Sequence, residues 1–425
     1  MKVYLATFGC AANQSSSEIM AARILEKGHS LTLEADAEVV VCNTCTVKYA
    51  TEQKILHKIR QWGIEGKEVL VTGCMPQVQL EDILETNSDV HVLGINSIAD
   101  VCMALERIES GDKRLRILTS VPEDFLNVPR KRFHSSIHIC QISQGCDNSC
   151  SYCIVTLARG PLKSFEPNAI VEDIRQAITE GCREIWLTSQ DAAQYGNDIG
   201  TNIGELLKRI SALEGDFRIR VGMMNPSSVN PILEELIEAF SDPKIYKLLH
   251  LPIQSASNMI LRKMNRRHTI EDANRIIRRF RETFPESTIF TDIIVGFPGE
   301  SDKDAALTEE WVKQIRPDKV NISRYTPRPH TIAWNFRNID SRIVVERSGR
   351  LHKLCDSIKL ESKKKKVGWK GEVFVSKKAK VKGFMTRTDA YHPVVIPQEE
   401  GITEGQRLTI EITDVTPGYF IGRVC

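Results

Sequence analysis

Three cysteines in one short loop limit the fold of this chain more than any other feature of its sequence. Cys146, Cys150 and Cys153 are spaced Cys-x3-Cys-x2-Cys, directly after an apolar alternation over residues 137–142 that predicts a strand. A cubane iron–sulfur cluster usually takes four thiolates, one for each iron. Because this loop offers only three, it predicts a cluster whose fourth iron is open to an exogenous small molecule.

A zinc knuckle or a set of reduced structural thiols is the alternative explanation of the same residues. Zinc prefers four closed ligands, often as two Cys-x2-Cys pairs, and the sequence near Cys153 contains no second pair. The spacing of the cysteines and their position after a strand therefore favour the iron–sulfur cluster.

Length, charge and cysteine usage restrict the class of protein. The 425 residues suffice for two or three domains, and a net charge of +2 means that any nucleic-acid-binding surface has to be local. The sequence shows no secretory leader and no apolar run long enough to span a bilayer. We therefore expect a cytoplasmic protein without a membrane partner, whose clustered cysteines serve metal binding or catalysis rather than disulfides.

Residues 1–111 alternate strand-like and helix-like segments, which predicts a doubly wound parallel α/β sheet with helices on both faces. The expected strands are Val3–Phe8, Glu38–Cys42, Glu68–Thr72 and Val90–Leu93. The expected helices are Ser15–Glu26, Ala50–Trp62, Gln77–Leu84 and Ser97–Ile108, the first opened by a capping box at residues 15–18.

Three further cysteines each follow one of these strands. Cys10, Cys45 and Cys74 come after the first, second and third expected strands. The carboxyl ends of parallel strands meet at one edge of a sheet, where ligands bind. A single buried cysteine is usually an inert part of a core, but this shared placement predicts a second three-cysteine cluster site with an open iron.

Residues 112–136 form a basic linker, and residues 137–340 repeat strand then helix six times. The repeat predicts a partial (β/α)6 barrel, TIM-like and open on one side, with its chemistry at the strand carboxyl ends. The expected strands are Ile137–Ser143, Glu184–Thr188, Arg218–Val221, Lys247–Leu249, Thr288–Ile294 and Lys319–Ile322. The expected helices are Ala169–Thr179, Ile203–Leu213, Ile232–Phe240, Ser257–Met264, Ile270–Thr283 and Asp304–Ile315.

Polar residues at those strand ends are candidate contacts for a bound zwitterion and ribose. Gln190, Gln254 and Asp292 are the stronger candidates, because each follows an apolar strand without an evident helix cap to serve. For the polar residues at 225–228, capping and turn formation remain an equal alternative. The full set of expected cofactor contacts from strand ends is Ser189, Gln190, Asp191, Gln254, Asp292 and Arg324.

The last third of the chain changes character. Residues 341–366 predict a linker helix, and residues 367–425 predict a small antiparallel β-barrel. Its expected strands are Val373–Val375, Ala379–Gly383, Pro393–Ile396, Arg407–Ile412 and Phe420–Val424. Ten basic residues and one acid lie between residues 363 and 387, with aromatic residues interleaved, which favours an RNA-binding surface over a merely solvated one. The candidate RNA contacts are Lys363, Lys364, Lys365, Lys366, Lys377, Lys378, Lys380, Lys382 and Arg387.

Taken together, these motifs resemble the radical S-adenosylmethionine (SAM) methylthiotransferases along nearly the whole chain. The matching stretches are Thr7-Phe8-Gly9-Cys10 with Asn13, Asn43-Thr44-Cys45, Thr72-Gly73-Cys74-Met75, the central cysteine loop with Tyr152, Leu251-Pro252-Ile253-Gln254-Ser255, residues 292–300, Tyr325-Thr326-Pro327-Arg328-Pro329 and residues 387–394. The resemblance implies an N-terminal cluster domain, a radical-SAM barrel and a C-terminal TRAM domain that binds RNA. It also implies two 4Fe-4S clusters, SAM at the open iron of the central loop, and Tyr152 among the cofactor contacts.

Leu187-Thr188-Ser189-Gln190-Asp191 is similar to the archaeal and eukaryotic branch of that family. That branch inserts a methylthio group at carbon 2 of N6-threonylcarbamoyladenosine, next to the anticodon. The bacterial motif Arg-Gly-x-Glu-x-Ser-Arg is replaced here by Arg159-Gly160-Pro161-Leu162-Lys163-Ser164-Phe165. The implied partners are the tRNA anticodon stem-loop, SAM and an electron donor. The alternatives are a methylthiotransferase for N6-isopentenyladenosine or a ribosomal-protein aspartate, an electron-transfer protein, and a noncatalytic RNA-binding protein.

Overall fold

The computed structural model describes residues 1–119, 124–379 and 383–425. Its N-terminal part is a six-stranded sheet in the order β2-β1-β3-β4-β5-β6, in which every pairing is parallel. The strands are β1 (Lys2–Thr7), β2 (Ser30–Leu31), β3 (Val39–Thr44), β4 (Glu68–Gly73), β5 (His91–Leu93) and β6 (Arg116–Ile117). The helices are α1 (Ala11–Glu26), α2 (Tyr49–Ile64), α3 (Met75–Val78), α4 (Leu80–Thr86) and α5 (Val101–Glu109).

The central strand β3 shows why this sheet is doubly wound. All six of its residues are buried, because two separate apolar clusters cover its faces, and a strand covered on both faces reads as a continuous apolar run. The predicted doubly wound α/β sheet is therefore confirmed.

The predicted start of α1 was wrong. The helix begins at Ala11, directly after Cys10, and residues 15–17 are buried inside it instead of capping it. The hydroxyl of Ser15 donates to the backbone oxygen of Ile139 over 3.1 Å, so this serine serves contact between the N-terminal sheet and the next part of the chain.

The middle of the chain forms the predicted open barrel. Two three-stranded parallel sheets, β11-β10-β7 and β12-β13-β14, are joined through an isolated bridge between Ile219 and Ile245. The edge strands β7 and β14 are not paired with each other, which leaves one side open. The strands are β7 (Ile137–Gln141), β10 (Glu184–Thr188), β11 (Arg218–Val221), β12 (Leu248–His250), β13 (Thr288–Val295) and β14 (Lys319–Arg324). The outer helices are α7 (Pro167–Thr179), α8 (Ile203–Ser211), α10 (Leu233–Phe240), α11 (Asn258–Lys263), α12 (Ile270–Thr283) and α13 (Asp302–Ile315).

The long helix α14 (Ser341–Lys364) leads into a closed five-stranded barrel in the order β15-β16-β17-β19-β18. Its strands are β15 (Lys370–Lys378), β16 (Phe384–Arg387), β17 (Pro393–Ile396), β18 (Arg407–Val415) and β19 (Phe420–Val424). The expectation of a purely antiparallel barrel needs one correction, because β17 pairs with β19 in parallel. The strand expected over residues 379–383 includes residues 380–382, which lie outside the described part, and the observed second strand begins at Phe384.

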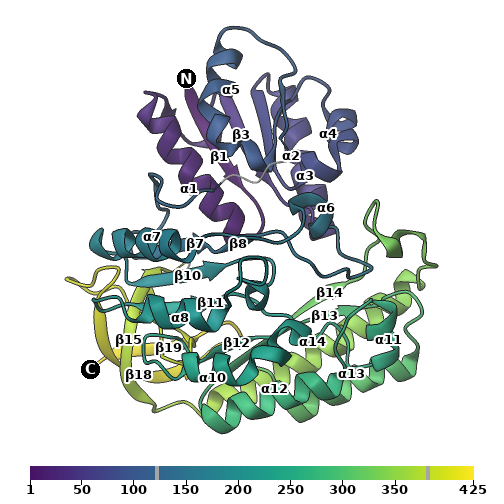
Figure 1. Cartoon of the computed structure of the whole chain (residues 1–425), viewed down its shortest axis with the longest axis vertical. Coiled ribbons are helices and arrows are strands. Elements are labelled where there is room, and N and C mark those ends of the chain that lie inside the picture. The colour runs from purple at the N-terminus through teal and green to yellow at the C-terminus, as the bar shows by residue number, and fades with distance from the viewer. Residues whose placement is uncertain (120–123, 380–382) are drawn as a thin grey trace.

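The N-terminal sheet lies at one end of the long axis of the molecule, and the open barrel lies at the other end with the C-terminal barrel beside its strands β10 and β11 (Figure 1). The C-terminal barrel contacts the strand beginnings of the open barrel: Arg218 bonds Asp389 over 3.1 Å, and the backbone amide of Lys247 donates to the oxygen of Asp389. The strand carboxyl ends are thus left to face the N-terminal sheet. Within the described residues, no helix is both long and apolar enough to cross a bilayer.

Candidate functional site

The loop that carries Cys146, Cys150 and Cys153 is held in place by its own backbone. Gly145, just before it, has φ +80°, and a Cβ at this position would lie 1.8 Å from the carbonyl oxygen of Pro161. Only glycine fits both the left-handed conformation and this close approach. The amide of Gly145 donates to Oε1 of Gln190 over 2.7 Å, which ties the loop to the end of β10.

Two side chains donate directly to sulfurs of this loop. Nδ2 of Asn148 lies 3.3 Å from Sγ of Cys146, and Nη1 of Arg266 lies 3.6 Å from Sγ of Cys150. Burial raises the pKa of Cys146 to about 11 and that of Cys153 to about 12. Without a metal these thiols are protonated at neutral pH, so metal binding would release protons from them.

The other three cysteines gather around one buried guanidinium. Arg159 lies on α6 (Val155–Arg159), the helix that follows Cys153, and it is 4% exposed. It is hydrogen-bonded to Cys74 and electrostatically coupled to Cys10 and Cys45. The prediction that the ends of β1, β3 and β4 bring these thiols to one edge of the sheet agrees with this placement, and α6 connects that edge to the central loop.

The strand ends at this edge are tightly cross-linked. Nδ2 of Asn13 donates to the backbone oxygens of Phe8 (2.8 Å) and Thr44 (2.7 Å), while its Oδ1 accepts from Arg159 over 2.8 Å. A Cβ on Gly9 would meet Cβ of Cys45 at 2.7 Å, so the turn after β1 requires glycine. These contacts fix the positions from which the thiols project.

A cavity of about 830 Å³ is lined by Cys146, Cys150 and Cys153, whereas Cys10, Cys45 and Cys74 do not line it themselves. Residues 47–50, which follow Cys45, line it from the N-terminal sheet. Residues 152–156 line it from the central loop, and residues 323–328 line it from the end of β14. This volume is in the range of sites that enclose a small organic ligand.

Most of the expected cofactor contacts line this cavity: Tyr152, Gln190, Asp191, Gln254, Asp292 and Arg324. Gln254 has φ +70°, an unusual backbone conformation for a residue other than glycine. Its backbone amide donates to the oxygen of Asp292 over 2.9 Å, and within the described residues its side-chain amide makes no hydrogen bond. Asp191 is already satisfied inside the protein, since it accepts from the amides of Ala193 and Asn225 and from Ser228. Ser189 is buried and lies outside the cavity lining, with a hydroxyl that has no partner among the described groups.

Sequence reasoning missed the partner of Asp292. Nε2 of His250 lies 2.7 Å from Oδ2 of this carboxylate, and Nδ2 of Asn321 donates to its Oδ1 over 2.8 Å. Burial acts to raise the pKa of Asp292, but the hydrogen bond and charge of His250, with the bond from Asn321, leave it below its ordinary value. The ionised carboxylate therefore faces the cavity; His250 directly follows the apolar pair at 248–249, which was the available signal.

The cavity also contains cations with different surroundings. Arg328 bonds Glu52 of α2 in a buried ion pair, and its Nη2 has no partner in the described part of the chain. The side chains of Lys48 and Arg324 are exposed and form no hydrogen bond or ion pair with any described group. These two cations remain available to an anionic ligand.

The arrangement of the thiols tests whether a single metal ion fits either set. Zn–S bonds of about 2.3 Å bring the sulfurs of a zinc site to within roughly 4 Å of one another. Among the described residues, the one set of three metal-binding side chains with all ligand atoms within 4.8 Å of one another consists of His138, Cys140 and Asp173. Neither cysteine set of the described chain has all three Sγ atoms within 4.8 Å of one another.

The basic residues expected to contact RNA are placed unequally. Lys363 is buried and donates to the backbone oxygens of Thr416 (3.1 Å) and Pro417 (3.3 Å), so its ammonium is occupied within the protein. Lys366 pairs with Glu286 and Lys365 with Glu361, while Lys364 and Lys378 are exposed. Lys377 lies over the Trp186 ring and Arg387 over the Tyr391 ring. Lys380 and Lys382 fall outside the described residues.

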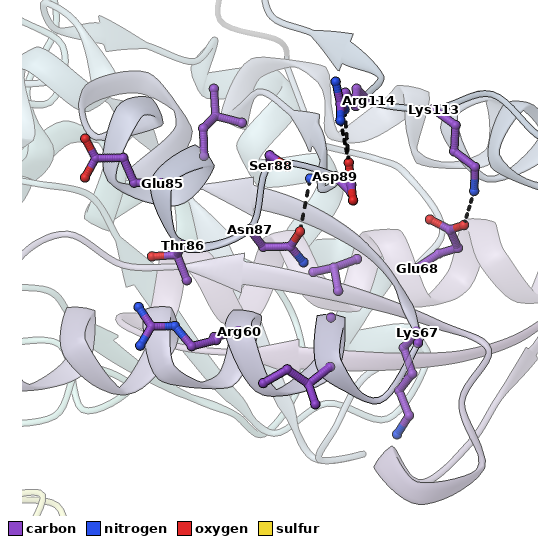
Figure 2. A pocket seen from close by; sticks show the side chains of 15 residues that line it. Arg60, Lys67, Glu68, Glu85, Thr86, Asn87, Ser88, Asp89, Lys113 and Arg114 are labelled. Carbon is purple, nitrogen blue, oxygen red and sulfur yellow. Dashed lines mark hydrogen bonds and ion pairs between the residues drawn. The ribbon is translucent and has the colours of Figure 1, made fainter.

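A second cavity, of about 970 Å³, lies at the opposite edge of the N-terminal sheet, around the start of β4 (Figure 2). Its charges are largely paired with one another: Lys113 bonds Glu68 over 2.6 Å, and Arg114 bonds Asp89 over 2.8 Å. None of the six candidate cysteines lines it, so it is not part of the candidate site.

Two family models match the chain. Residues 140–312 match the Radical SAM superfamily, and residues 2–94 match the Uncharacterized protein family UPF0004. A "Probable threonylcarbamoyladenosine tRNA methylthiotransferase" of Pyrococcus abyssi is 43% identical, with 100% of this chain and 99% of the relative covered. The protein of the same name from Methanothermobacter thermautotrophicus is 38% identical, with 99% of each chain covered. The human threonylcarbamoyladenosine tRNA methylthiotransferase is 32% identical, with 99% of this chain and 74% of that protein covered.

Solved structures agree on the fold. The radical S-adenosylmethionine methyltransferase TsrM of Kitasatospora setae, with cobalamin and a 4Fe-4S cluster bound, superposes with a TM-score of 0.57 at 15% identity. The match covers 78% of this chain and 77% of TsrM. At this identity the likeness supports the shared architecture alone.

Proposed function

Because this chain belongs to the threonylcarbamoyladenosine tRNA methylthiotransferases, we propose that it replaces hydrogen with a methylthio group at carbon 2 of N6-threonylcarbamoyladenosine in tRNA. This C–H bond is unactivated and carries no acidic proton, so acid–base catalysis does not replace it with sulfur. A radical-SAM enzyme has the required chemistry, and the family implies a 4Fe-4S cluster and SAM.

The proposal includes two clusters, one for each cysteine set. Cys146, Cys150 and Cys153 would hold the first, and Cys10, Cys45 and Cys74 the second. When bound, the first supplies the electron that cleaves SAM, and the second carries the sulfur that is transferred. The observation that supports this division most strongly is that Cys10, Cys45 and Cys74 gather around Arg159, apart from the three cysteines that line the cavity.

The chain's own residues would position the small molecules in this cavity. Gln190 holds the loop through Gly145, and Gln254 presents a free amide group toward the cavity. Asp292, kept ionised by His250, fits the hydroxyl groups of a ribose. Residues 47–50, which follow Cys45, and residues 152–156, which include Cys153, line the cavity from the N-terminal sheet and from the central loop.

The unpaired cations favour the threonylcarbamoyl substrate over the runner-up. The threonyl group ends in a carboxylate, whereas an isopentenyl group is entirely apolar. Lys48 from the N-terminal sheet and Arg324 from β14 line the same cavity and form no hydrogen bond or ion pair with an acid of the described residues, although Lys48 acts on Asp292 through space. A carboxylate between them would gain two charge-assisted contacts, and an isopentenyl group would leave both cations unmatched.

The anticodon stem-loop and an electron donor complete the proposal. The modified adenosine lies next to the anticodon, so the stem-loop has to reach the cavity, and reductive cleavage of SAM requires an electron from outside the chain. The exposed basic residues Lys364 and Lys378 belong to the part of the chain that we propose contacts RNA.

Nucleoside mass spectrometry tests the activity. The reconstituted protein, with SAM and dithionite, is given one tRNA that carries N6-threonylcarbamoyladenosine and one that carries N6-isopentenyladenosine. We expect the mass gain of one methylthio group in the first alone. Product in the second alone would replace the proposed substrate with its runner-up, and SAM cleavage without product in either would contradict the proposal.

A further inference from the structure

Four cations from three parts of the chain converge below the candidate cavity. They are Arg220 on β11, Lys319 on β14, Lys359 on α14 and Arg387 on β16, here called the cationic layer. Lys319 is electrostatically coupled to the other three. Only Arg387 belongs to the basic segment recognised in the sequence; the open barrel and the long helix supply the rest.

The register of the strands places this layer next to the candidate cavity. Lys319 pairs with Phe290, and Asn321 pairs with Asp292 two residues further along the same strands. Residues two apart on a strand point to the same face and lie about 7 Å apart. The layer therefore lies about 7 Å from Asp292, toward the strand beginnings, on the inner face of the open barrel.

The ionised Asp292 acts on Lys319 through space, but no acid among the described residues pairs directly with the layer. In the part of the chain that the structure describes, none of the four side chains forms a hydrogen bond or an ion pair, and Nε of Arg387 is buried without a partner. The nearby acids are occupied: Asp292 by His250 and Asn321, and Glu184 by Trp186 and Ser376. Burial, and then the charges of Arg220 and Arg387, lower the pKa of Lys319. Because the cations of the layer repel one another, an external anion bound among them would be strongly attracted.

Aromatic rings accompany these cations. The guanidinium of Arg220 lies 5.3 Å from the Trp186 ring and 5.7 Å from the Tyr391 ring. The guanidinium of Arg387 lies 4.4 Å from the same Tyr391 ring, and the ammonium of Lys319 lies 5.1 Å from the ring of Phe290. Basic groups interleaved with aromatic rings are typical of surfaces that bind single-stranded nucleic acid.

We propose that the cationic layer binds the phosphodiester backbone of the tRNA anticodon loop, so that the neighbouring adenosine enters the cavity above it. The inference rests on the proposed tRNA substrate. It assigns RNA contact to the inner face of the open barrel and to α14, beyond the C-terminal barrel. Basic residues of the open barrel and α14, together with those of the C-terminal barrel, would then hold the anticodon loop from two sides.

Salt-dependent tRNA binding by the full-length apo protein tests this assignment. Arg220→Gln with Lys319→Gln should weaken binding of a substrate tRNA about tenfold or more, and lower the slope of log Kd against log of KCl concentration by about 1.5, because two phosphate contacts are lost. The matched control is Arg278→Gln with Lys303→Gln, which removes two exposed charges from the outer helices α12 and α13 and should leave both quantities unchanged.

Further variants separate charge loss from misfolding. The charge-preserving pair Arg220→Lys with Lys319→Arg should retain the wild-type slope, and Lys359→Gln alone should lower it in the same direction. An affinity and slope equal to those of the control pair would overturn the inference. Competition by poly-glutamate as strong as by tRNA would assign the layer to an acidic protein partner and would overturn it as well.

Product formation separates this inference from the proposed function. If the wild-type protein forms the methylthio product while the layer variants bind tRNA normally, the inference fails and the proposed function stands. If the layer variants lose tRNA binding but the wild-type protein forms no product on any tRNA, the proposed reaction fails and the RNA contact remains.

Discussion

At the scale of single residues, the central loop depends on one glycine. Gly145 combines φ +80° with a carbonyl oxygen 1.8 Å from where a Cβ would lie. Gly160, on the same part of the chain, has φ +76° but no atom within 4 Å of a Cβ. The two positions separate the cost of backbone strain from the cost of a clash.

We therefore expect Gly145→Ala to lower stability and iron content far more than Gly160→Ala. The control substitution should cost about 1 kcal/mol from the left-handed conformation alone, whereas the clash at Gly145 forces the loop to move. Urea unfolding and iron analysis after reconstitution provide the comparison. Equal iron content in the two variants would show that the loop tolerates displacement.

Lys48 carries the second prediction at this scale. Lys48→Gln removes a cation that we expect to contact the threonyl carboxylate, so kcat/KM for the threonylcarbamoyl tRNA should fall about tenfold to a hundredfold, as for a lost charged hydrogen bond. Lys54→Gln, an exposed lysine on α2 outside the cavity lining, is the matched control. A fall of the same size in both variants would remove Lys48 from the substrate site.

His392 gives a prediction about pH. Burial, and then Lys366, Lys363 and Arg387, lower its pKa to about 3. The folded state thus binds this proton less readily than the unfolded state, so stability from neutral His392 is present above pH 6.5 and is lost as the pH falls below it. Denaturant unfolding should show a loss of about 2 kcal/mol between pH 7 and pH 5 that disappears in His392→Asn. An unchanged pH dependence in this variant would contradict the buried neutral state.

The six candidate cysteines could be predicted from sequence because each follows a strand or lies in one tight loop, and strand order places such positions together. Arg159 and Arg266 were missed, because the reach of a guanidinium toward sulfur depends on packing between distant elements. Lys363 was expected on an RNA-binding surface, yet it is buried against backbone carbonyls of residues 416–417. Local composition predicts a basic surface, but tertiary packing decides which lysines remain on it.

At the scale of elements, the strands were more predictable than their connections. The six open-barrel strands lie close to the expected ranges, since apolar runs in buried parallel strands are strong signals. The start of α1 and the parallel pairing of β17 with β19 were not predicted correctly, because both depend on contacts that local sequence does not encode. In α1, Ser15, which resembles a cap residue, serves contact with β7.

The ion pair between Glu52 of α2 and Arg328, which follows β14, gives a prediction at the scale of elements. Glu52→Ala leaves Arg328 buried and unpaired, which should cost about 3–5 kcal/mol. The double variant Glu52→Ala with Arg328→Ala should cost less than the sum of the two single changes. Unfolding measurements on all four proteins complete the cycle, and additive costs would show that the pair does not couple the two elements.

At the scale of the whole molecule, the three parts of the chain act on one cavity. The N-terminal sheet supplies residues 47–50 with Lys48, the open barrel supplies the central cysteine loop and the polar strand ends, and the C-terminal barrel closes the strand beginnings with Arg387 in the cationic layer. Arg159 lies between the two cysteine sets, on the helix that leaves the central loop. The account therefore requires the sheet and the barrel to remain in contact during the reaction.

Iron content per chain tests the central claim most directly. Wild-type protein, the variant with Cys10, Cys45 and Cys74 changed to alanine, and the variant with Cys146, Cys150 and Cys153 changed to alanine are reconstituted and analysed together. The account predicts that each triple variant keeps half of the wild-type iron, because each set holds its own cluster. Iron content unchanged by the loss of Cys10, Cys45 and Cys74 would contradict it.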